Sequence, residues 1–85
     1  MKEEKTNFQM LRDLLEVYIP ERMGIATAGE VKLIKEKLRL ENMSVLELRN
    51  MRDFVVAYMG VDDMDRMSAI VAVVDGELFD RNGCV

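Results

Sequence analysis

Asp62, Asp63 and Asp65 are the densest group of possible metal ligands in this 85-residue chain. Carboxylate oxygens are ligands that hard divalent cations prefer. Their spacing does not match an EF-hand loop, in which a glycine and a distant glutamate complete an alternating ligand set. Aspartates also cap the free amides of a helix start and complement its dipole. We therefore interpret the group as a helix start and assign no metal ligand, and a cation or small-ligand site at 62–65 stays an alternative.

The chain lacks the side chains on which most enzymes depend. It has no histidine, which removes imidazole acid–base catalysis and the common nucleophile pairs. Its one cysteine, Cys84, cannot form a disulfide within the chain, as is usual in a reducing compartment. The five glycines are scattered, so they form no glycine-rich phosphate loop. We predict a protein that is not an enzyme, with no catalytic residue and no cofactor.

A basic strip of Lys32, Lys35 and Arg39 falls on one side of a predicted helix. Such a strip can meet phosphates or an acidic protein surface. The formal net charge of −4 argues against a nucleic-acid partner, because binding to the phosphate backbone requires clustered lysines and arginines. A helix-turn-helix would also need a shorter connection than the one over 39–44. We interpret the strip as a solvated face and keep a weak DNA-binding regulator as an alternative.

Three capping boxes indicate where helices begin. In each, a serine or threonine caps the first amides and a glutamate or glutamine three residues later reaches back. The pairs are Thr6 with Gln9, Thr27 with Glu30, and Ser44 with Glu47. Apolar residues at helical spacing follow each pair. Pro20 should end the first helix, and Gly60 is suited to a left-handed residue at the end of the third.

We predict an all-α fold, a compact four-helix bundle-like domain with helices over 7–18, 28–40, 45–59 and 63–80. Residues 1–85 form a single domain in this prediction, with flexible ends at 1–5 and 82–85. The fourth helix has an alternative, because "AIVAVVDGELF" over 69–79 also fits a β-hairpin with a turn at Asp75-Gly76. A lone pair of short strands is poorly stable, which favours the helix.

Two predicted helices are apolar around most of their circumference, over 54–59 and 69–74. A helix with this pattern is buried on more than one side. A domain of 85 residues has difficulty enclosing two such helices, so we expect part of this surface to contact a second copy or another protein. The predicted interface residues are Phe54, Val56, Tyr58, Met59, Met67 and Val73.

These features together predict a small acidic interaction protein that acts by binding another macromolecule, as a homodimer. Proteins of this description include inhibitors and regulators of the kind that phages and mobile elements carry, and we expect a protein partner. The N-terminal "MKEEKTNFQ" does not resemble a secretory signal, and the apolar runs are shorter than the ~20 residues that cross a bilayer. We therefore expect a cytoplasmic protein without a membrane partner.

Overall fold

The computed structural model describes residues 5–19 and 26–82, and the secondary structure within these ranges is helical throughout. The elements are α1 (Asn7–Val17), α2 (Ala28–Leu38), the 3-10 helix η1 (Leu40–Asn42), α3 (Val45–Met59), the 3-10 helix η2 (Gly60–Asp63) and α4 (Met64–Asn82). The all-α prediction is confirmed. The hairpin alternative for 69–79 is wrong, because this segment lies inside α4. The predicted flexible ends lie outside the described residues except for Lys5 and Asn82, and Cys84 lies outside them as well.

All three capping boxes form as predicted. At the start of α1, the Thr6 hydroxyl accepts from the Gln9 amide at 3.2 Å, and the Gln9 side chain accepts from the Thr6 amide at 2.9 Å. The boxes that begin α2 and α3 have the same reciprocal geometry. Each box satisfies two amide donors that the helix itself leaves unpaired, so local sequence determines where these three helices start.

The second helix ends two residues before the predicted boundary. Its cap residue, Arg39, has φ 55° and ψ 42°, the left-handed conformation that glycine adopts most readily. The chain then forms η1 before α3 begins. At the end of α3, Gly60 is the cap residue and has the expected positive φ, 51°, but its ψ of −138° lies outside the left-handed helical region, so the predicted left-handed cap is not formed.

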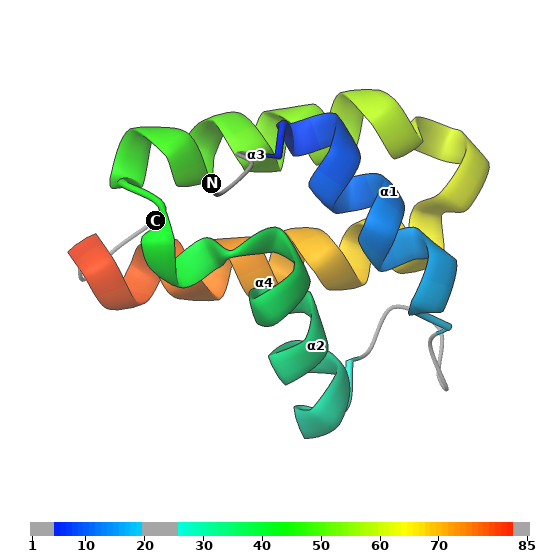
Figure 1. Cartoon of the computed structure of the whole chain (residues 1–85), viewed down its shortest axis with the longest axis horizontal. Helices are drawn as coiled ribbons and strands as arrows, with labels where there is room; N and C mark the ends of the chain where they lie inside the picture. Colours follow the sequence, from blue (N-terminus) through cyan, green and yellow to red (C-terminus); the bar gives the residue numbers. More distant parts are fainter. Residues whose placement is uncertain (1–4, 20–25, 83–85) are drawn as a thin grey trace.

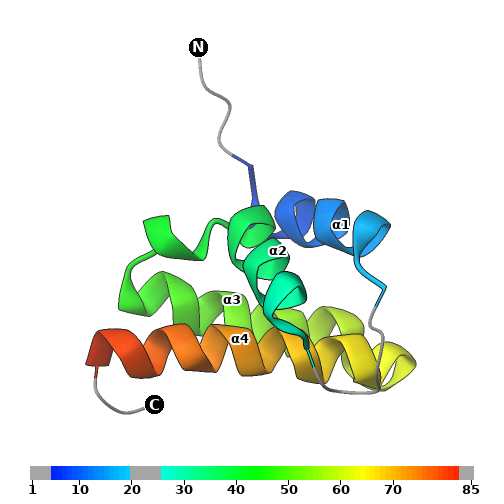
Figure 2. The ribbon, with the colours of Figure 1, turned by 90° about the horizontal axis from the view of Figure 1, so that it is seen from below.

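The third and fourth helices are not separate rods. Helical residues continue without a gap from 45 to 82, because η2 joins α3 directly to α4. The two helices run antiparallel and side by side, with α3 along the upper edge of Figure 1 and α4 below it. Helices α1 and α2 form a second layer across this hairpin, as Figure 2 shows. The fold is thus a helical hairpin covered by two shorter helices.

The core lies between the two layers and receives side chains from all four helices and η1. The apolar residues of α1 and α2 occur at helical spacing, so each helix turns one face toward the hairpin. The largest side chains that are almost completely buried are Tyr18, Leu11, Leu14, Ile34, Leu38, Leu40, Leu48, Met51, Val55, Ile70 and Val74.

Two arginines of α4 connect the hairpin to the other layer. Arg66 donates from Nη1 to the main-chain oxygens of Leu15, at 3.0 Å, and Tyr18, at 3.4 Å. These oxygens belong to the C-terminal end of α1, where carbonyls have no partner within the helix. Asp63 pairs with the same guanidinium group and orients it.

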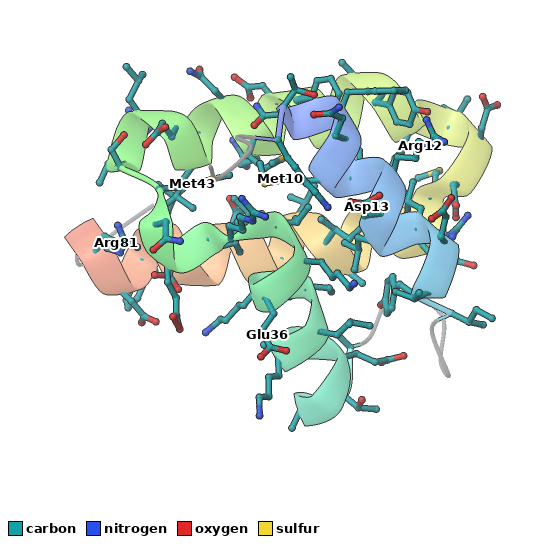
Figure 3. The ribbon with its side chains drawn as sticks, in the orientation of Figure 1. Met10, Arg12, Asp13, Glu36, Met43 and Arg81 are labelled. Carbon is teal, nitrogen blue, oxygen red and sulfur yellow. The ribbon has the colours of Figure 1, made fainter. Side chains whose placement is uncertain are left out.

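Arg81 makes the equivalent contact at the other end of α4. Its Nη2 donates to the main-chain oxygens of Leu40, at 3.1 Å, and Glu41, at 3.0 Å, while Nη1 donates to that of Met43. Glu77, one turn earlier, accepts from Arg81 Nε at 3.0 Å. Figure 3 shows Arg81 at the left of the molecule, beside the segment that holds Met43. We call Arg66 and Arg81 the arginine clamps.

Candidate interaction surface

Three aromatic side chains form a half-exposed cluster between α1 and α3, which we call the aromatic patch. Phe8 lies in the first turn of α1, and Phe54 and Tyr58 lie one turn apart on α3. The Phe8 and Tyr58 rings meet edge to face, with centroids 5.4 Å apart and planes at 79°. The Phe54 and Tyr58 rings stack, with centroids 5.7 Å apart and planes at 13°. Both arrangements are favourable for aromatic pairs.

The rings of the patch pack on one another although much of the patch faces solvent. The capping box of Thr6 and Gln9 fixes the first turn of α1, and Phe8 lies inside that turn. Phe8 and Tyr58 keep 42% and 48% of their surface exposed, whereas Phe54 is partly buried against the core. Rings that already pack on one another have less side-chain entropy to lose when a partner covers them than isolated side chains have. The arrangement therefore resembles a preformed contact site.

The structure divides the six predicted interface residues into three groups. Val56 and Tyr58 are exposed, and Phe54 and Met67 are partly buried where they pack against the core. Met59 and Val73 keep only 4% and 7% of their surface and belong to the core itself. Their placement in an exposed interface is therefore corrected. When a helix is apolar on all sides, its sequence does not indicate which side faces solvent. Here the packing of α3 against α4 determines which side is buried.

Sequence analysis did not identify Phe8 as part of this surface. Phe8 follows the capping box at 6–9, and the buried positions of α1 are Met10, Leu11 and Leu14. With a turn of 3.6 residues, Phe8 lies beside that apolar face rather than within it. The sequence therefore indicated only that Phe8 lies outside the buried face of α1. Its contact with Tyr58, 50 positions later, depends on how α1 crosses α3 and has no local signature.

The structure gathers the predicted basic strip around a hollow on α2. Lys32, Lys35 and Arg39 all line a space of about 460 Å³, and the carboxylates of Glu36 and Glu41 line it too. Lys35 also approaches Glu77 of α4, with its Nζ 3.8 Å from Oε1. The positive charge of the strip is thus partly balanced by acidic neighbours. This arrangement suits a solvated, mixed-charge face better than a phosphate site.

The acidic turn supports the fold at one of the clamps. Asp63 is partly buried and pairs with Arg66, while Asp62 and Asp65 are exposed. Across residues 5–19 and 26–82, no group of three acidic or cysteine side chains is placed to hold a metal ion. The turn therefore has an evident structural use in orienting Arg66.

Two ionisable groups of α1 have shifted pKa values. A hydrogen bond from the Lys5 ammonium group lowers the pKa of the partly exposed Asp13. Burial raises the pKa of Tyr18, the charge of Glu30 adds to this effect, and that of Arg66 opposes it. The Tyr18 hydroxyl is buried and finds no hydrogen-bond partner in the described part of the structure.

Comparison with protein families, with curated proteins and with solved structures finds no match for this chain. None of the helices that the structure describes has the combination of length and apolarity needed to cross a membrane.

Proposed function

We propose that the protein acts without catalysis, by binding another protein through the aromatic patch, and that it does so as a homodimer. The observation that carries the proposal is the half-exposed packing of Phe8, Phe54 and Tyr58 on one another across two helices. Aromatic residues are enriched in protein interfaces and provide a large share of their binding energy. A partner surface with an apolar pocket would cover these rings with little reorganisation.

The biological role that we attach to this activity is that of an inhibitor or regulator in the cytoplasm, of the phage or mobile-element type. The net charge of −4 and the absence of histidine support a binding role over a catalytic one. The mixed charges around the basic strip give less support to a DNA-binding regulator.

The test compares partner capture by matched variants. Purified wild-type protein is used to capture partners from a lysate of its native host, and the captured protein is then produced alone for direct titration. Phe8→Ala and Tyr58→Ala should each weaken binding at least about tenfold, as expected for residues at the centre of an interface.

Leu46→Ala is the control. Leu46 is also an exposed apolar residue of α3, at 67%, but it lies in the first turn, far along the helix from Tyr58. It should leave the affinity unchanged. A partner that binds Phe8→Ala and Tyr58→Ala as tightly as wild type would contradict the aromatic patch as the binding site.

A further inference from the structure

A polar hollow lies where the start of α1, the segment around η1 and the first half of α3 meet. Its volume is about 420 Å³, and its lining comes from residues within 5–10, 39–43 and 47–50. Figure 3 labels two of these residues, Met10 on α1 and Met43 just before α3. Because segments far apart in the sequence build it, the hollow is a product of the tertiary structure. It shares no residue with the aromatic patch.

The hollow has an apolar floor and a polar rim. Met10 and Met43 line it but keep only 5% and 8% of their surface exposed, so they lie at its base. Arg39, Asn42 and Asn50 line it as exposed residues and form part of its rim. Small-molecule sites combine the same two features, apolar surface for contact and a few polar groups that fix the orientation of the ligand.

Arg39 occupies its position on the rim at a cost to the fold. Its φ of 55° and ψ of 42° are easier for glycine than for arginine. Within residues 5–19 and 26–82, its guanidinium group forms no ion pair or hydrogen bond, in contrast to the arginine clamps. Backbone strain of this kind is concentrated at functional sites. A ligand on the guanidinium group would give the strained residue a use.

The hollow has an excess of positive charge. Among its described lining residues, Glu47 is the single carboxylate, and one of its oxygens accepts from the Ser44 amide at 2.8 Å in the capping box. Lys5 pairs with Asp13, so the unpaired charge of the lining is that of Arg39. A guanidinium group binds phosphate through two parallel hydrogen bonds. The hollow beside the basic strip differs, because two carboxylates line it with the same arginine.

Three asparagines supply directional hydrogen-bonding groups around the hollow. Asn7 comes from α1, Asn42 from η1 and Asn50 from α3. None of their side-chain amides hydrogen-bonds to another residue that the structure describes. A side-chain amide places a donor beside an acceptor, which complements the edge of a nucleobase. The methionine floor suits a flat ring, because thioethers make favourable contacts with aromatic systems.

The volume of the hollow indicates a ligand larger than an inorganic anion. A space of 420 Å³ corresponds to about fourteen water molecules. We propose that the hollow binds a nucleoside monophosphate, with its phosphate on Arg39 and its base over Met10 and Met43, within reach of the asparagine amides. This site goes beyond the proposed function and does not depend on it, because the two surfaces have no residue in common.

The experiment follows the amide resonances of the isotopically labelled full chain by NMR while a nucleoside monophosphate is added. The monophosphates of adenosine, guanosine, cytidine and uridine are tested separately. At least one should shift the Asn7, Asn42 and Asn50 side-chain amides and the Arg39 main-chain amide, with saturation at millimolar concentration. The matching nucleoside and inorganic phosphate should each bind at least about tenfold more weakly, because each lacks part of the contacts.

Two variants test the rim without weakening the fold. Arg39→Gly should reduce the affinity at least about tenfold, although glycine suits the left-handed backbone better than arginine does. Asn50→Ala should reduce it about fivefold, although alanine is the better helix former. Arg49→Met is the control, because it removes a positive charge from the neighbouring position of α3 but does not line the hollow. It should leave the affinity unchanged, and thermal melts of the same samples show that each variant is folded.

Three outcomes would overturn the proposal. The first is that none of the four nucleotides shifts these resonances at millimolar concentration. The second is that inorganic phosphate binds as tightly as the nucleotides, which would show an adventitious anion on Arg39 only. The third is that Arg39→Gly and Asn50→Ala bind the nucleotide as tightly as wild type. None of these results affects partner binding by the aromatic patch, which is scored by Phe8→Ala and Tyr58→Ala.

Discussion

Arg81 donates a hydrogen bond of 3.1 Å from Nη2 to the main-chain oxygen of Leu40, a residue 41 positions earlier in the chain. The same guanidinium group binds the oxygens of Glu41 and Met43. A single side chain of α4 therefore satisfies the polar backbone of the segment that joins α2 to α3. The clamp explains how a segment with no long helix of its own keeps a defined shape.

Replacing Arg81 with methionine should lower the free energy of unfolding by about 2 kcal/mol, because three carbonyls lose a charged donor. Denaturation in urea measures the change. Arg49→Met is the matched control, since Arg49 is an exposed arginine of α3, and it should cost at most about 0.5 kcal/mol. Equal losses in the two variants would show that the clamp contributes nothing beyond surface charge.

Arg39→Gly should raise the free energy of unfolding by about 0.5–1 kcal/mol, because glycine adopts the left-handed conformation of this position without steric cost. Lys37→Gly provides the comparison, since Lys37 lies two residues earlier within α2. There glycine should destabilise the protein by about 1 kcal/mol. Thermal melts of both variants test the difference in sign, and a loss of stability in Arg39→Gly would contradict the argument.

Val73→Glu and Val56→Glu should differ in their effect on stability. Val73 is 7% exposed, so the glutamate would be buried without a partner and should destabilise the fold by several kcal/mol. Val56 is 45% exposed, and there the substitution should cost less than about 1 kcal/mol. Circular dichroism during thermal unfolding gives both values. Similar losses of stability in the two variants would contradict the difference in burial between Val73 and Val56.

Stability at high pH should depend on Tyr18. Its pKa is raised by burial, so the unfolded chain releases this proton first as the pH rises. Stability from the neutral hydroxyl is fully present below the unfolded pKa of about 10 and is lost as the pH climbs through the folded value. Tyr18→Phe should flatten this alkaline loss, and near pH 7 it should leave stability unchanged or slightly raised, because it removes an unpaired buried hydroxyl.

Urea denaturation between pH 7 and pH 11 measures this effect. Tyr58→Phe is the control, because it removes an exposed hydroxyl and leaves Tyr18 intact. It should keep the alkaline slope of the wild type. A slope that is identical in wild type and Tyr18→Phe would contradict the role of Tyr18.

The parts of the fold that depend on local chemistry were predictable. The capping boxes at Thr6, Thr27 and Ser44 involve residues three positions apart, and all three helix starts are where they were expected. The end of α2 was not, because an arginine in a left-handed conformation carries no recognisable signal. The direct joining of α3 to α4 through η2 was missed as well.

The candidate site was only partly predictable for a related reason. Tyr58, Phe54 and Val56 were identified from a run of apolar residues, but such a run does not say which side of the helix faces out. Because α3 packs against α4, Met59 and Val73 are buried in the core. Phe8 joined the aromatic patch through a crossing of helices that only the tertiary structure determines.

The arginine clamps have a consequence for the order in which the chain assembles. The carbonyls that they satisfy belong to α1 and to the segment after α2, which are synthesised before residues 66 and 81. Until α4 exists, those backbone groups have only water as a partner. The hairpin of α3 and α4, in contrast, is built from neighbouring segments and closes a short loop, which favours its early formation. We therefore expect α4 to pair with α3 first and then to fix α1 and the segment after α2 in place.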